Sequence, residues 1–207
     1  MKKIILLLAL CFAFGVNAQT QYQTGMKKAF SLWEENKMDE ASQLFERISK
    51  AETENWLPPY YAATIEILGS FGLKDEAKLD AKLKKAKTFI DEADALSPNN
   101  PEIIIMKALL NTGYIAFDGQ KYGMTLSGDN AQLYAKALEL APNNPRVVLS
   151  KAEWDMGMAR FFGKSMKPYC DAVKRSLELA KKEEIDIEFY PKYQKDRAEE
   201  VIAKCKE

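Results

Sequence analysis

The chain has 207 residues with 30 basic and 30 acidic side chains, so its formal net charge is zero. This length suits one domain or one continuous repeat array, and the balanced charge argues against a nucleic-acid partner, which needs clustered basic residues. The chain contains no histidine. It therefore lacks the commonest general base and the commonest nitrogen ligand of metals.

Residues 1–18 have the three-part layout of a secretory signal peptide. Two lysines precede an apolar run from Ile4 to Val16, and a site of small and medium residues ends at Ala18. The run, about 13 residues long, is shorter than the roughly 20 residues needed to span a bilayer. We expect cleavage between Ala18 and Gln19 and a periplasmic or secreted mature chain without a transmembrane helix. Cleavage removes two lysines and no acid, which changes the formal charge to −2.

Two alternatives stay open for this N-terminal segment. The apolar run would serve as a membrane anchor if it were not cleaved. The segment Leu8-Ala9-Leu10-Cys11 also resembles the acylation site of a lipoprotein, although Leu10 stands where Gly, Ala or Ser is expected. The intact mass of the mature protein separates these alternatives, because acylation at Cys11 adds a lipid.

Two cysteines, Cys170 and Cys205, remain after cleavage. Disulfides persist in the oxidising compartments that exported proteins reach. We therefore predict a bridge that ties the last helix to the helix before it. The alternative is a pair of buried free thiols, which are common in helical cores.

Apolar residues recur at helical spacing along the mature chain, whereas the alternation typical of strands never persists. The sequence therefore predicts an all-α fold. In chain order, we expect helices over residues 21–35, 146–160, 168–182 and 191–204, with a turn at 161–164. Another helix contains residues 41–48, and further helix pairs start near residues 55 and 101. Around residues 69–83 we expect a longer helix or a loop.

The element Leu-x-Pro-Asn-Asn-Pro occurs twice, at residues 96–101 and 140–145, with an offset of 44 residues. The first proline ends one helix because it has no N–H to donate, and Asn-Asn accepts turn geometry. The second proline suits the first position of the next helix, since its φ is already helical. Each copy is therefore predicted to join two helices.

The chain resembles the tetratricopeptide repeat (TPR) family, whose repeat is a 34-residue helix–turn–helix. Residues that fit its pattern are Ala41, Phe45, Ala86, Ile90, Ala93, Pro98, Ala108, Tyr134, Ala137, Pro142 and Ala152, whereas Asn130 stands where Ala is expected. The resemblance implies a right-handed stack over residues 19–207, with units that start near residues 22, 55, 101 and 145. A terminal helix at about 191–204 caps it. Two spacings exceed 34 residues, and we expect the stretch 117–130 to be a loop and a second candidate surface.

The resemblance also implies a concave groove, lined by the first helix of each pair, that receives a protein or peptide. The candidate groove residues are Trp33, Tyr60, Tyr61, Glu102, Ile105, Leu109, Arg146, Leu149, Glu153 and Met156. Aromatic and charged residues dominate interface energies. The alternative is that these aromatics belong to the core, where residues at helical spacing are most often found.

No motif of catalysis is present: the sequence has neither a phosphate-binding loop nor a nucleophile elbow. Cys170 and Cys205 lack the paired spacing of a zinc site, and adjacent acids such as Glu183-Glu184 are expected to be solvated, because neighbours on a helix do not face each other. We expect no enzyme, no cofactor and no metal. The sequence favours a scaffold for protein–protein interaction in the periplasm or envelope; a binding module for a glycan or another small ligand is the alternative.

Overall fold

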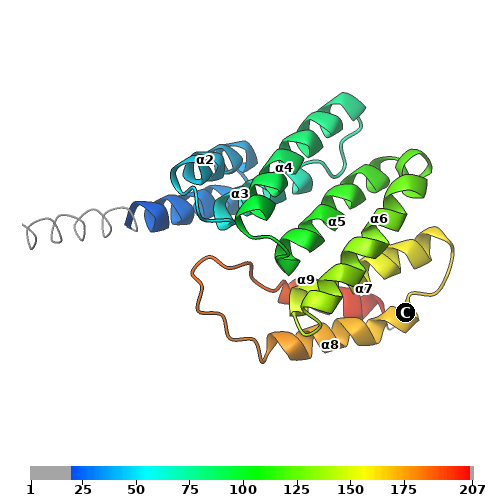
Figure 1. Cartoon of the computed structure of the whole chain (residues 1–207). Coiled ribbons are helices and arrows are strands. Elements are labelled where there is room, and N and C mark those ends of the chain that lie inside the picture. Colours follow the sequence, from blue (N-terminus) through cyan, green and yellow to red (C-terminus); the bar gives the residue numbers. More distant parts are fainter. Residues whose placement is uncertain (1–19, 206–207) are drawn as a thin grey trace, which may run out of the picture.

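The computed structural model describes residues 20–205 (Figure 1). The predicted signal peptide, its cleavage site and Cys11 lie outside the described residues.

Regular structure within residues 20–205 is helical, with no strand, which confirms the predicted all-α class. The elements are a helix at residues 20–34, α2 (Met38–Ala51), α3 (Leu57–Leu68), α4 (Glu76–Leu96), α5 (Pro101–Phe117), α6 (Gly119–Leu140), α7 (Pro145–Phe161), the short 3-10 helix η1 (Lys167–Tyr169), α8 (Cys170–Ala180) and α9 (Lys195–Lys204).

The helices stack in pairs along the chain (Figure 1). From α2 to α9 each α-helix packs on the next, and α3 also contacts α5, as α5 contacts α7. We call the 20–34 helix, α3, α5 and α7 the first helices, and α2, α4, α6 and α8 the second helices. A pair cannot cover its apolar face alone, so neighbouring pairs stabilise one another.

Both Pro-Asn-Asn-Pro joints have the predicted geometry: Pro101 begins α5 and Pro145 begins α7. The asparagines before these prolines, predicted to accept turn geometry, also cap the helices. Oδ1 of Asn100 accepts from the backbone N–H of Glu102 at 2.9 Å, and Oδ1 of Asn144 accepts from that of Arg146 at 2.9 Å. Asparagine at this position is a preferred N-cap, because it satisfies an otherwise unpaired donor.

The prediction that residues 117–130 form a loop is wrong, because they belong to the end of α5 and the first half of α6. Asp118 begins α6 as its N-cap, accepting from the backbone N–H groups of Gln120 and Lys121 at 3.0 Å each. Tyr122 then donates to Glu76 of α4 at 2.6 Å. A cap and packing against α5 thus outweigh the glycine content, which had favoured a loop.

Asn130, where the repeat pattern calls for a small residue, is fully buried on α6. Its Nδ2 donates to the carbonyl oxygen of Ala108 at 3.1 Å and to Oγ1 of Thr112 at 3.2 Å. Its Oδ1 accepts from Asn111 at 2.9 Å. A buried amide is tolerated when its polar atoms are paired, so this network replaces the close packing that alanine gives.

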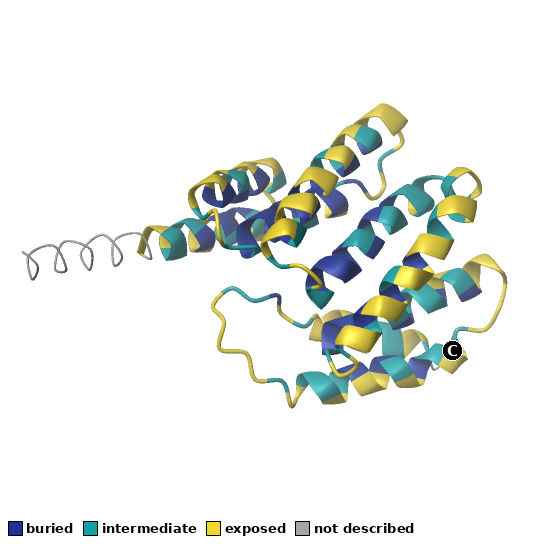
Figure 2. Ribbon diagram, in the orientation of Figure 1, coloured by how far each residue is buried: buried dark blue, intermediate teal, exposed yellow. Residues whose placement is uncertain are grey.

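Buried residues gather on the inner sides of the helices (Figure 2), in three clusters that follow one another along the stack. Alanines with no exposed surface, such as Ala62, Ala86 and Ala137, let helices approach closely. Larger side chains, such as Phe45 and Ile103, fill the remaining space.

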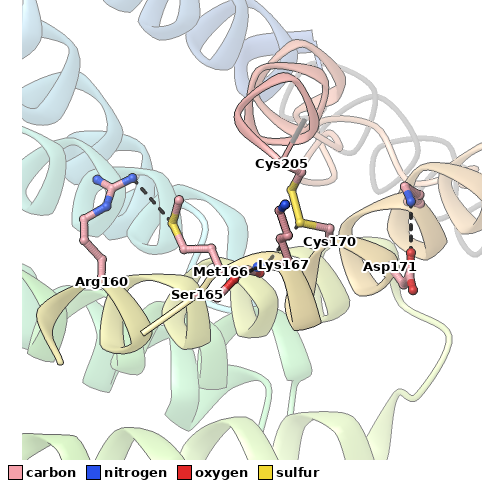
Figure 3. Close-up of a disulfide and its surroundings, with 8 residues drawn as sticks. Arg160, Ser165, Met166, Lys167, Cys170, Asp171 and Cys205 are labelled. Atoms are coloured by element: carbon pink, nitrogen blue, oxygen red, sulfur yellow. Dashed lines mark hydrogen bonds and ion pairs between the residues drawn. A yellow bond between two sulfur atoms is a disulfide. The ribbon is translucent and has the colours of Figure 1, made fainter. Parts of the chain in front are cut away.

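The predicted disulfide is present: Cys170 and Cys205 are bonded, with Cα atoms 6.1 Å apart. It joins the start of α8 to the end of α9 (Figure 3). α9 begins at Lys195, four residues beyond the start expected near Pro191. Residues 183–186 and 190–194 form neither helix nor strand.

Candidate binding face

The segment between α8 and α9 lies against the first helices. We call residues 183–193 the strap; it is the orange segment that loops out from α8 and returns to α9 in Figure 1. Glu183 contacts Arg146 of α7, and the chain then reaches the 20–34 helix at Glu188. It returns to α8 at Tyr193, whose hydroxyl is 2.7 Å from that of Ser176. We call the residues that contact the strap its seat.

The tip of the strap is a turn in which Phe189 inserts among aromatic rings. The Phe189 ring stacks on Phe30 with centroids 5.9 Å apart and meets Tyr22 edge-on at 5.7 Å. The hydroxyl of Tyr61 donates to the backbone carbonyl of Phe189 at 2.7 Å. Phe189 has a φ of 61°, which is rare for a bulky residue. Its surroundings therefore hold the tip in a conformation that the residue itself disfavours.

Donor groups of the first helix meet the acidic residue beside this turn. Nε2 of Gln23 donates to Glu188 at 2.7 Å, and the ammonium of Lys27 lies 3.7 Å from the same carboxylate. These groups are largely exposed, so the contacts position the strap more than they stabilise it.

Tyr190 crosses the seat near the N-terminal ends of α3, α5 and α7. Its ring meets Trp56 edge-on at 5.8 Å and lies 5.1 Å from the guanidinium of Arg146. Its hydroxyl donates to Oε1 of Glu102 over a long 3.4 Å. Burial, followed by the charge of Glu102, raises the pKa of Tyr190 to about 12. The phenol is therefore neutral and acts as a donor at physiological pH.

Arg146 is the buried centre of the seat, with two acidic partners. Its Nε donates to Oε1 of Glu102 at 2.7 Å, and its two terminal nitrogens donate to the two oxygens of Glu183, each at 2.7 Å. Burial alone would lower the pKa of Arg146, but the partners Glu183 and Glu102 raise it above the usual value. Glu183, expected to be solvated, is thus the bidentate partner that fixes one end of the strap.

A carboxylate oxygen of the seat lacks a hydrogen-bond partner in the described part of the chain. Oε2 of Glu102 is buried without a hydrogen bond to any described residue, although Oε1 accepts from Arg146 and from Asn144 at 2.7 Å each. Buried polar atoms in native proteins are almost always paired. Glu102 itself is fully buried, so this acceptor lies beneath the surface of the seat.

The structure places the sequence-predicted groove residues in two groups. Trp33, Tyr60 and Tyr61 belong to the aromatic cluster at the strap, and Glu102 and Arg146 lie beneath Tyr190.

The other five predicted groove residues are mostly packed in the core. Ile105, Leu149 and Met156 are buried, and Leu109 is partly buried against the main cluster. Glu153 accepts from Arg197 of α9 at 2.6 Å, and burial raises the pKa of its carboxyl group. α9 thus covers this end of the first-helix surface. The role of the ten predicted groove residues in binding stays a prediction.

The sequence predicted no role for Phe189 and Tyr190, which lie between the expected helices 168–182 and 191–204, and it predicted a solvated side chain at Glu183. The available signal was local: Glu188-Phe189-Tyr190 places an acid beside two aromatics just before a proline. That composition does not reveal a contact with a helix more than 150 residues earlier in the chain.

A separate hollow of about 480 Å³ lies between α4 and α6, over α5. Ile90, Leu110 and Leu133 give it an apolar part, and Lys87, Lys107 and Lys136 also line it. Its volume is in the range of small-ligand sites.

Among residues 20–205, no group of three or more acidic, cysteine or histidine side chains is placed to hold a metal ion. None of the helices in this part of the chain is both long and apolar enough to cross a membrane.

No family model matches the chain, and no curated protein matches it significantly by sequence. A solved structure does match: the HusA haemophore from Porphyromonas gingivalis, with a TM-score of 0.76 and 21% identity over 89% of this chain and 92% of that chain. The two proteins share a fold. The match spans nearly the whole length of both chains, but at 21% identity it shows a shared architecture only.

Proposed function

We propose that this chain is an exported, non-enzymatic scaffold of the tetratricopeptide type that binds another protein through the strap seat. One observation carries the proposal: the seat already holds a non-helical stretch of polypeptide, the chain's own strap. It does so with a hydrogen bond to a backbone carbonyl, an ion pair to Arg146 and aromatic contacts. These are the means by which proteins hold extended peptides.

The proposed export rests on two independent features. Residues 1–18 have the layout of a signal peptide. The Cys170–Cys205 disulfide fits an oxidising compartment, where such bonds persist. The absence of histidine and of recognised catalytic motifs from the sequence supports a binding role over catalysis.

A photo-crosslinking amino acid at Ile187 tests the proposal in the cells that make the protein. Ile187 is 58% exposed on the strap, beside the seat. The matched control is Met124, which is 94% exposed on the second helix α6. We expect a specific protein adduct from position 187 and not from position 124. Identical adducts from both positions, or none from either, would contradict the proposal.

The second candidate is the carriage of a small anionic ligand of the porphyrin class. The hollow between α4 and α6 favours it, since apolar residues line a volume that suits such a ligand. Three lysines face two aspartates, Asp91 and Asp129, in the lining, which leaves one positive charge in excess. HusA, which shares the fold, is described as a haemophore. A porphyrin iron would need a ligand other than imidazole here, because the sequence has no histidine.

Haemin titration followed by absorbance tests this second candidate. Carriage predicts a saturable shift of the Soret band that weakens in Lys107→Glu. The exposed Lys192→Glu, on the strap and outside the hollow, is the control. A spectrum unchanged by the protein would eliminate the candidate.

A further inference from the structure

We propose that the seat at the strap tip is a binding site for an acidic–aromatic segment of the partner, which displaces the strap. The site consists of Tyr22, Phe30, Tyr61, Gln23 and Lys27. It rests on the proposed function and deepens it, because the chemistry of the seat specifies what a partner must present.

The seat offers donors and ring faces to whatever occupies it. Lys27 and Gln23 provide donors for a carboxylate, and the Tyr61 hydroxyl donates to a backbone carbonyl. Phe30 and Tyr22 accept a ring by stacking and by an edge contact. An acidic residue followed by an aromatic residue matches this set, as Glu188-Phe189 does from within the chain.

Features of the strap suit it to be displaced. Ile185 and Ile187 are 38% and 58% exposed, although both are apolar. Phe189 has a left-handed backbone, which a partner's aromatic residue in an ordinary conformation would not need. The contacts that Glu188 and Phe189 lose on leaving can be remade by an acidic residue and an aromatic residue of the partner.

Displacement has a thermodynamic consequence. The strap is tethered at both ends, to α8 and α9, so its effective concentration at the seat is high. An external segment must compete with this tethered copy. Weakening the strap should therefore raise the affinity for an external peptide by roughly tenfold or more.

The test uses a fluorescent peptide with the sequence Ile-Asp-Ile-Glu-Phe-Tyr-Pro and the full-length mature protein. Phe189→Gly with Tyr190→Ser removes the two strap rings that contact the first-helix side of the seat, and gives the strap-opened variant. Anisotropy should show binding to the strap-opened variant at least about tenfold tighter than to the wild type. Circular dichroism and an intact disulfide verify that the variant is folded.

Exchanging the charges of Lys27 and of the peptide's Glu gives the decisive comparison. Adding Lys27→Glu to the strap-opened variant should weaken binding of the peptide about threefold, and a peptide with Lys in place of its Glu should regain that loss. The neighbouring exposed Lys28→Glu should have no effect. Equal binding by wild type and strap-opened variant, or a loss at Lys27 that the exchanged peptide does not restore, overturns the proposal.

Different results would contradict the scaffold proposal and the acidic–aromatic site. A crosslinked partner at position 187 together with a strap-opened variant that ignores the peptide would preserve the scaffold and overturn the acidic–aromatic site. A strap-opened variant that binds haemin and not the peptide would assign the seat to a flat small ligand instead.

Discussion

Tyr61 of α3 donates a hydrogen bond to the backbone carbonyl of Phe189 at 2.7 Å, across 128 residues of sequence. This bond joins the beginning of the stack to the segment that precedes its last helix. Burial, followed by the charge of Glu102, raises the pKa of Tyr61, so the phenol remains a donor at neutral pH. The strap is therefore part of the folded structure and not a loose connection.

Removing this hydroxyl should loosen the strap. We expect Tyr61→Phe to lower the free energy of unfolding by about 0.5–1.5 kcal/mol, because the Phe189 carbonyl loses its donor. Tyr22→Phe is the matched control, since the Tyr22 ring also contacts Phe189 but its hydroxyl makes no hydrogen bond to the strap. Urea unfolding measures both. A Tyr22→Phe variant that loses as much as Tyr61→Phe would contradict the account.

The pair formed by Arg146 and Glu102 should behave as a buried ion pair. Arg146→Met should lower the free energy of unfolding by about 3–5 kcal/mol, because it leaves the fully buried Glu102 without its cation. Glu102→Met in addition should restore a large part of that loss, since no uncompensated charge remains there. Strictly additive losses in urea unfolding would show that the two side chains are not coupled.

A glycine in α6 tests the helical assignment of the stretch expected to be a loop. A Cβ at Gly128 would meet no atom within 4 Å. Gly128→Ala should therefore raise the free energy of unfolding by about 0.5–1 kcal/mol, because alanine loses less backbone entropy in a helix. Gly72→Ala is the control: it also has space, but its φ of 82° disfavours alanine, so it should destabilise. A destabilised Gly128→Ala would contradict a helix there.

The Cys170–Cys205 bridge closes the chain on either side of the strap. Replacing both cysteines with alanine should lower the free energy of unfolding by about 3–4 kcal/mol, from the loop entropy of a separation of 35 residues. Thiol titration of the denatured, unreduced wild type should find no reactive cysteine. Two reactive thiols, or unchanged stability in the variant, would refute the role of the bridge.

Local chemistry explains what the sequence could predict. Pro101 and Pro145 specify where helices begin, and the cysteine count specifies the disulfide. The prediction of a loop at residues 117–130 is wrong because it rests on their glycines. The cap at Asp118 and packing on α5 stabilise a helix there instead. The strap could not be foreseen, because Glu183 and Phe189 acquire their partners only through tertiary contacts with Arg146 and Tyr61.

Closing the strap covalently tests the central claim most directly. Gln23→Cys and Glu188→Cys place thiols where two side chains now meet at 2.7 Å, and a short bismaleimide would lock the strap on its seat. The same variant capped with a monofunctional maleimide is the control. We predict that the locked protein binds the acidic–aromatic peptide at least about tenfold more weakly than the capped protein. Equal affinity of the two would show that the seat under the strap is not the binding site.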